Sequence, residues 1–144
     1  MKKYLKLLFV ALFATMTLSL ASCKNDKDEP SGSNSDIVGT WKCTEGLLVN
    51  AWDGAELYAQ FQSNGTLRQV TITPALFPGD ETETDAITGK WEVKDGYLFL
   101  SGDGSLTGSG KIIKVSNDYL EVEMMSIVHK FKRVSDSVVD KYFK

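Results

Sequence analysis

The feature that most constrains this chain is an alternation of apolar and polar residues between positions 37 and 134, interrupted by turn signals at short intervals. Successive side chains of a β-strand point to opposite faces, so the alternation indicates strands with one buried face. In the segment 55–62, for example, Leu57, Ala59 and Phe61 share one face. No long stripe of helical periodicity occurs here, and the sequence therefore predicts an antiparallel all-β domain.

Glycine, proline and asparagine residues divide this region into about eight strands. Asn64-Gly65 is a strong hairpin signal, because these residues accept the positive φ angles of a tight turn. Pro74 and Pro78 end the strand that follows, and an acidic loop over 80–85 precedes the next one. This number and spacing favour an antiparallel sandwich or an up-and-down barrel. The predicted strands are 37–48, 55–62, 66–73, 87–94, 97–101, 111–115, 119–125 and 127–134.

The C-terminal residues follow a different spacing. Val138, Val139, Tyr142 and Phe143 lie at i, i+1, i+4 and i+5, which predicts a short helix that caps the strands.

One segment of the chain recurs. Gly39-Thr40-Trp41 is matched by Gly89-Lys90-Trp91, and seven of 18 positions are identical between 37–54 and 87–104. The match favours two related four-strand halves, and the alternative is two hairpins that share turn residues. In either case we expect the two Gly-x-Trp segments to have similar structural roles.

The N-terminus has the features of a secretion signal. Residues 1–6 are basic, and the apolar run 7–20 is too short to span a membrane stably. Leu20-Ala21-Ser22-Cys23 resembles the lipobox of bacterial lipoproteins, in which the cysteine receives a diacylglycerol and cleavage occurs before it. The resemblance implies a lipoprotein signal peptide over 1–22 and lipid attachment at Cys23. The alternative is an ordinary secretory signal cut near Ala21.

A polar tract separates this cysteine from the strands. The segment 23–36 is rich in Gly, Ser, Pro and Asp, and such a composition predicts a flexible tether with a reach of roughly 20 Å. The predicted folded domain, 37–144, contains 108 residues, enough for one core. Asp26, Asp28 and Glu29 are similar to a signal that exports lipoproteins to the cell surface, and a generic solvated linker is the alternative.

Charge excludes some partners. All 19 acidic residues but only 13 of the 16 Lys and Arg follow residue 22, so the processed chain has a net charge of −6. This argues against nucleic acid, whose binders carry clustered positive charge, and against electrostatic binding to anionic lipid. We therefore expect the acyl chains to hold the protein to the outer membrane.

Three short motifs resemble the lipocalin family. Gly39-Thr40-Trp41 at the start of the first strand, with Arg133 near the end of the last, is similar to the lipocalin arrangement in which tryptophan closes one end of the barrel and arginine packs on its ring. The segments 61–66 and 131–134 resemble short lipocalin-like domains of exported lipoproteins. The resemblance implies an eight-stranded up-and-down barrel with Gly39, Trp41 and Arg133 as its plug.

No catalytic motif is evident. His129 is the single histidine, no Gly-x-Ser-x-Gly elbow accompanies it, and too few His and Cys ligands exist for a zinc site. With Cys23 acylated, Cys43 has no disulfide partner and is expected to be a small buried hydrophobe. We therefore expect a non-catalytic protein with no cofactor and no metal.

The leading function hypothesis is the binding of a small apolar or amphipathic molecule in the barrel mouth by a monomer. The alternative is a protein-interaction or inhibitor module of the cell envelope, in which the barrel is filled. The candidate ligand-binding residues are aromatic: Trp41, Tyr58, Phe61, Trp91, Phe99 and Phe131.

Overall fold

The computed structural model describes residues 33–102 and 107–144. The predicted signal peptide, Cys23 and the tether up to residue 32 lie outside this range. Within it, no helix is long and apolar enough to cross a membrane.

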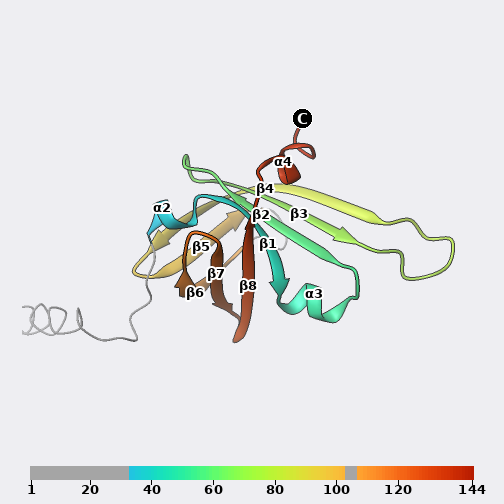
Figure 1. Cartoon of the computed structure of the whole chain (residues 1–144), viewed down its shortest axis with the longest axis horizontal. Helices are drawn as coiled ribbons and strands as arrows, with labels where there is room; N and C mark the ends of the chain where they lie inside the picture. The colour runs from blue at the N-terminus through green and yellow to red at the C-terminus, as the bar shows by residue number, and fades with distance from the viewer. Residues whose placement is uncertain (1–32, 103–106) are drawn as a thin grey trace, which may run out of the picture.

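Eight antiparallel strands form a closed barrel in which each strand pairs with its neighbours in the sequence and β1 pairs with β8 (Figure 1). The predicted all-β barrel is therefore confirmed. The strands are β1 (Gly39–Glu45), β2 (Glu56–Phe61), β3 (Thr66–Thr73), β4 (Glu83–Lys94), β5 (Tyr97–Gly102), β6 (Gly108–Val115), β7 (Tyr119–Met124) and β8 (Ile127–Val134).

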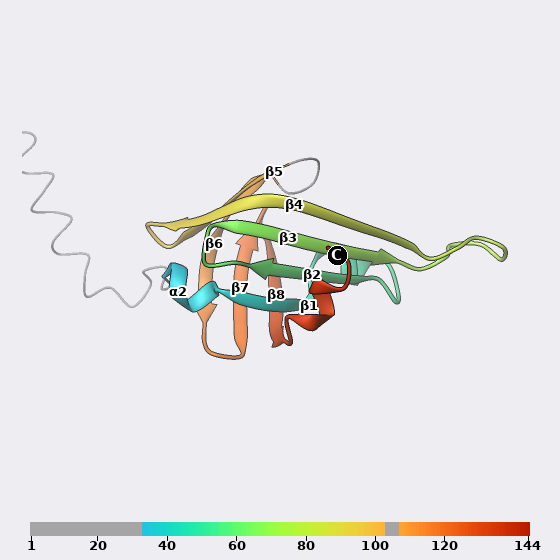
Figure 2. The same cartoon turned by 90° about the horizontal axis from the view of Figure 1, so that it is seen from above.

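Three strand boundaries differ from the prediction by three or more residues. One is the start of β6, which lies at Gly108 and not at residue 111, because residues 108–110, predicted to be part of a loop, pair with β5. The first strand ends at Glu45, and the apolar segment after it forms the short helix α3 (Leu47–Ala51) instead of extending the strand. The fourth strand begins at Glu83, four residues earlier than predicted, because Thr73 and Glu83 pair at the far end of a long β3–β4 hairpin. This hairpin extends well beyond the other strands (Figure 2).

The two ends of the barrel differ in their connections. At one end, three tight turns join β2 to β3, β4 to β5 and β6 to β7, and the short helix α2 (Asn34–Ile37) lies beside them. Residues 34–36, predicted to belong to the tether, thus form part of this helix. Asn34 anchors it through its side-chain oxygen, which accepts the Val93 amide at 2.8 Å. We call this the sealed end, and the opposite end, with α3 and the long hairpin, the open end.

The main hydrophobic core lies at the sealed end. Trp41, Ile112 and Ile37 are completely buried there, and the last of these belongs to α2. The core also contains Ala59, Phe61, Leu67, Trp91, Leu98, Leu120 and Val122.

A second, smaller cluster lies on the outer wall. The predicted C-terminal helix is confirmed as α4 (Ser137–Asp140), but it packs against the outside of β2 and β3 and does not cap an end. Val139 is completely buried there beside Tyr58 and Val70. The Gln60 amide donates to Asp140 Oδ1 at 3.0 Å and fixes the helix to the wall.

The recurring Gly-x-Trp segments do not mark two four-strand halves. The first lies in β1 and the second in β4, and these two strands run in opposite directions around an up-and-down barrel. The two tryptophans nevertheless fill the same end, because Trp41 lies near the start of its strand and Trp91 near the end of its own. Their structural roles are similar, as expected, although the backbone around them is not equivalent.

Candidate functional site: a sealed barrel end opposite an open one

The sealed end is closed by Trp41 and Arg133. The guanidinium carbon lies 4.2 Å from the centre of the indole ring, within the range of a cation–π interaction. The indole nitrogen donates to the Ile37 carbonyl at 2.8 Å, and Arg133 donates to the carbonyls of Val38 and Asp36 at 2.7 and 3.2 Å. The arginine therefore ties the N-terminal segment to the last strand across the tryptophan.

Gly39 makes this arrangement possible. Its φ angle is +133°, and a Cβ atom built at this position would lie 2.0 Å from Arg133 Nη1. Only glycine provides both the backbone conformation and the space that the guanidinium occupies. The structure thus brings together the three residues predicted to form the plug.

Trp91 and Phe61 complete the closure. Their rings meet edge to face with centres 5.2 Å apart, and the Trp91 indole donates to the Gln62 carbonyl at 3.0 Å. Together with Trp41 they pack the sealed half of the interior with side chains. These three predicted ligand-binding residues therefore form the barrel floor.

Two other candidates, Tyr58 and Phe99, do not face the barrel interior. Tyr58 belongs to the outer-wall cluster under α4, and Lys42 Nζ lies 5.4 Å from the centre of its ring. Phe99 lies between the inward-facing Leu98 and Leu100, so its ring points outward and is 38% exposed. Neither ring lines the interior, because both occupy the outward positions of their strands.

The open half of the interior has a mixed lining. Strand alternation directs half-buried apolar side chains inward, among them Leu57, Ile87 and Met124, none of which was among the aromatic candidates. Gln69 and Thr71 face the same space and contact each other at 3.4 Å. Phe131 is the one predicted aromatic residue of this half that faces inward. The pattern of alternating residues could have identified the others, had aliphatic side chains been considered.

Cys43 and His129 meet at the open end around Gly46. A Cβ atom at Gly46 would lie 2.5 Å from His129 Cδ2 and 3.2 Å from Cys43 Sγ. The imidazole Nε2 accepts the Leu47 amide at 3.5 Å, a long contact, and Nδ1 lies 3.1 Å from the Ile127 carbonyl. The thiol lies 3.2 Å from the Glu45 carbonyl, and burial raises its pKa to about 11. These groups stabilise the start of α3, and the thiol lacks the low pKa of a nucleophile.

Cys43 is therefore expected to resist thiol reagents. A thiol with a pKa of about 11 is ionised in about one molecule in a thousand at pH 8, against roughly a quarter for an unperturbed cysteine. The Cys23→Ala protein retains Cys43 as its single thiol. Its reaction with 5,5′-dithiobis(2-nitrobenzoate) should be at least a hundredfold slower when native than in urea. Equal rates in the two conditions would contradict the burial of this thiol.

Two hollows lie on the outside of the sealed half, away from the open mouth. The first, of about 450 Å³, separates α2 from the β2–β3 turn, and the second, of about 570 Å³, lies over the outer wall of β4 and β5. Gly65 and Trp91 border both hollows.

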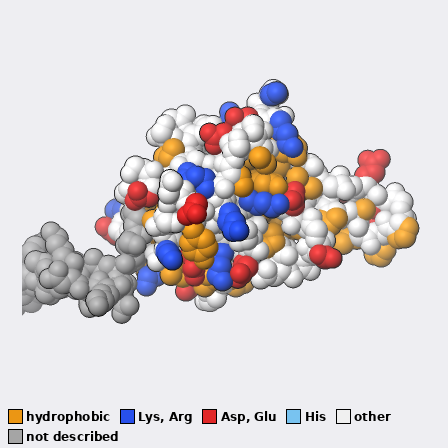
Figure 3. Space-filling model, viewed as in Figure 1, with side chains coloured by type: hydrophobic (Ala, Val, Ile, Leu, Met, Phe, Trp, Pro, Cys, Tyr) orange, Lys and Arg blue, Asp and Glu red, His pale blue; other side chains and the backbone are white. Residues whose placement is uncertain are grey.

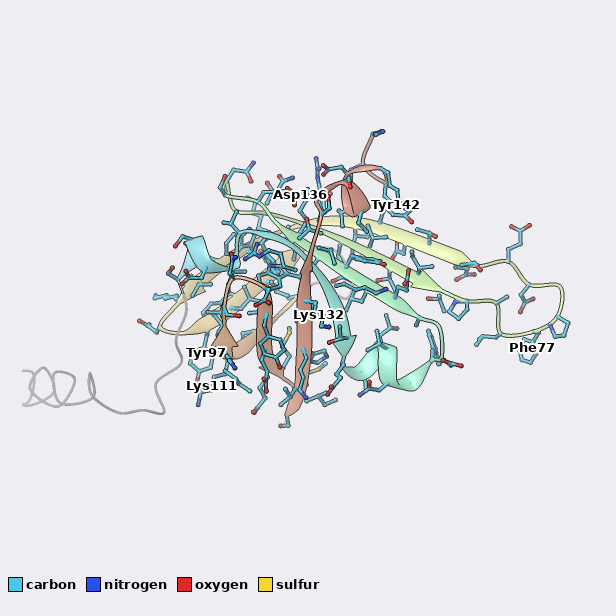
Figure 4. All side chains as sticks on the ribbon, viewed as in Figure 1. Phe77, Tyr97, Lys111, Lys132, Asp136 and Tyr142 are labelled. Carbon is cyan, nitrogen blue, oxygen red and sulfur yellow. The ribbon has the colours of Figure 1, made fainter. Side chains whose placement is uncertain are left out.

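The β3–β4 hairpin carries an exposed apolar tip. Leu76 and Phe77 are 62% and 70% exposed, and Figures 3 and 4 show hydrophobic side chains, with Phe77 labelled, at the far end of this projection. The tip is ordered by a turn in which the Asp80 amide donates to the Phe77 carbonyl at 3.0 Å and Gly79 has a φ of +103°. The sequence analysis predicted an acidic loop over 80–85 and assigned no role to Leu76 and Phe77.

No protein-family model matches the sequence, and no curated protein matches it. Among solved structures, a lipocalin-like protein from Bacteroides uniformis is 14% identical, with a TM-score of 0.48 over 69% of this chain and 99% of that one. Japanin from Rhipicephalus appendiculatus, solved bound to cholesterol, is 10% identical, with a TM-score of 0.45 over 79% of this chain and 91% of its own. Identities this low carry no information about the ligand of this chain.

Proposed function

We propose that this chain is a non-catalytic, lipid-anchored barrel protein that binds a small apolar or amphipathic molecule at its open end. The observation that carries the proposal is the difference between the two halves of the interior. One half is packed by Trp41, Phe61 and Trp91, whereas inward side chains of the other half, such as Leu57, Gln69 and Thr71, are half-buried and lie outside this core. Apolar side chains with a few polar groups among them are the usual lining of a ligand site.

The lining suits an amphipathic ligand better than a purely apolar one. Gln69 and Thr71 offer amide and hydroxyl groups beside Leu57 and Ile87. A ligand with one polar group can satisfy these side chains while its apolar part displaces water from the aliphatic ones. Because the sealed half is filled, the site is shallow and takes part of a long molecule, with the remainder outside the mouth.

A fluorescent fatty acid tests this proposal. Titration with cis-parinaric acid should give saturable energy transfer from tryptophan to the probe. Leu57→Arg places a long charged side chain at the mouth, from which it can reach water, and should weaken binding at least tenfold. Leu76→Arg is the matched control, because its site on the hairpin tip is 62% exposed and should leave binding unchanged. Urea unfolding of both variants checks that they fold.

A protein-interaction module is the second candidate, and the exposed hairpin tip favours it. Leu76 and Phe77 are held by a fixed turn on a projecting element, which is how a protein presents an anchor to a partner's pocket. If fatty-acid binding does not saturate, or if Leu76→Arg weakens this binding as much as Leu57→Arg, the proposed open-end site is wrong. The protein-interaction module then becomes the proposed function.

The proposed anchor is the acylated Cys23, in the outer membrane and facing the cell surface. The chain enters the described domain beside α2, so a tether from Cys23 would join the sealed end and leave the open mouth unobstructed. Cys23→Ala should move the protein from the detergent phase to the aqueous phase on Triton X-114 partition. Retention in the detergent phase would contradict the lipid anchor.

Surface exposure depends on the acidic residues of the tether. Replacing Asp26, Asp28 and Glu29 together by alanine should protect the protein from external protease in whole cells. Replacing Lys24 and Lys27 by alanine is the control and should leave it accessible. If external protease cleaves both variants equally, the acidic residues do not direct export and belong to an ordinary linker.

A further inference from the structure

We propose a second binding site, for an oligosaccharide chain, on the outer wall of the barrel over β4 and β5. It is separate from the open-end site, and neither depends on the other. The site begins with the hollow of about 570 Å³ at the sealed half of the barrel. Its lining residues come from the β2–β3 turn and from two strands: Asn64, Gly65, Thr66, Lys90, Trp91, Glu92, Phe99, Leu100 and Ser101.

Two aromatic rings lie side by side along this wall. Phe99 and Tyr97 occupy successive outward positions of β5, about 7 Å apart along the strand, and are 38% and 41% exposed. Figure 4 shows Tyr97 on the outside of the barrel close to Lys111, its partner across the β5–β6 pair. An exposed ring face can pack against the apolar C–H face of a sugar ring and leave the sugar hydroxyls free to hydrogen-bond. Two such rings in line suit a chain of sugars.

The polar groups around the rings include both donors and acceptors. Glu92 pairs with Phe99 across β4 and β5, and Lys90 pairs with Ser101 in the next outward row. These three polar side chains form no hydrogen bond or ion pair with other described residues. Sugar hydroxyls donate and accept at once, so they require such a mixed set.

The charge of this wall favours a neutral ligand. Acidic and basic side chains alternate over the strands and the adjoining turn, and their charges cancel. A site for an anion such as a phosphate would show a single sign of charge. The charged residues of the wall are Lys90, Lys94, Lys111, Glu92, Asp95 and Glu123.

The wall of the hollow is held in place by backbone hydrogen bonds. The Trp91 amide donates to the Gly65 carbonyl at 2.9 Å, and the Trp91 indole donates to the Gln62 carbonyl at 3.0 Å. The β2–β3 turn is thus attached to β4 directly beside the outward-facing groups. A fixed wall lowers the entropic cost of binding, and Trp91 provides a fluorescence reporter at the edge of the site.

Calorimetric and tryptophan-fluorescence titrations with three neutral hexasaccharides test the proposal. The probes are maltohexaose, cellohexaose and laminarihexaose, and at least one should bind saturably. Phe99→Ala and Tyr97→Ala should each weaken that binding by roughly tenfold. Trp52→Ala is the matched control, because it removes an aromatic side chain of similar exposure, 43%, at the open end. It should leave sugar binding unchanged.

Three outcomes would overturn the site. The first is that none of the three hexasaccharides saturates. The second is that Leu57→Arg, designed against the open-end site, weakens sugar binding as much as Phe99→Ala does. The third is self-association of the protein that Phe99→Ala removes, in the absence of sugar binding, which would make this wall an interface between copies. Loss of fatty-acid binding with retained hexasaccharide binding would disprove only the open-end site.

Discussion

Replacing Trp41 by alanine is expected to lower the free energy of unfolding by about 3–5 kcal/mol. The indole is completely buried at the sealed end, so its removal leaves a cavity that the surrounding strands can fill only in part. Two polar losses accompany the cavity. The Ile37 carbonyl loses the indole donor at 2.8 Å, and the Arg133 guanidinium loses the ring on which it packs.

Urea denaturation followed by circular dichroism measures this effect. Trp52→Ala is the control, because Trp52 is 43% exposed and its removal should change stability by no more than about 0.5 kcal/mol. Trp41→Phe keeps much of the buried volume and should fall between the two. Equal stability of the Trp41→Ala and Trp52→Ala proteins would mean that the sealed end does not hold the barrel together.

The sequence predicts the boundaries of a strand well where turn residues and apolar–polar alternation indicate the same residues. The boundaries of β3 and β8 were predicted to the residue, because turn residues flank segments of clear alternation. The start of β4 was missed, since residues 83–86 are polar and exposed and pair with β3 outside the barrel. Pairing of this kind depends on backbone hydrogen bonds and leaves little hydrophobic pattern in the sequence.

The plug was easier to predict than the ligand site. The resemblance to lipocalin motifs named Gly39, Trp41 and Arg133 together, and in the structure Arg133 contacts both of the other two. Ligand residues have no such signature. Tyr58 is large and aromatic, yet it is buried by α4, a contact between segments about eighty residues apart that alternation alone does not predict. The alternation of side chains along β5 does place Phe99 on the outside of the barrel. It was nevertheless counted among the ligand-binding candidates because it is aromatic.

Gly39→Ala is expected to cost roughly 3–6 kcal/mol, a sum of backbone strain at a positive φ and of the hydrogen bonds lost by a displaced arginine. A side-chain end can usually move away from a new methyl group at little cost. Arg133 cannot do so here, because its guanidinium group donates to the carbonyls of Val38, Asp36 and Asn117. The new Cβ would lie 2.0 Å from its Nη1 atom, so these bonds and the contact with the indole ring must give way together.

A double-mutant cycle separates the clash from the strain. Gly54→Ala, at a φ of +81° with its nearest neighbour 3.6 Å away, reports the cost of a positive φ alone and should lose about 1–2 kcal/mol. Arg133→Ala removes the guanidinium group that the new methyl group at position 39 would strike. If the arginine is the obstacle, Gly39→Ala should cost far less in the Arg133→Ala protein than in the parent, with a coupling of at least 1 kcal/mol. If the losses of unfolding free energy in the two single variants simply add, the whole effect of Gly39→Ala comes from the backbone conformation at residue 39. The fixed arginine would then not be the reason why glycine occupies this position.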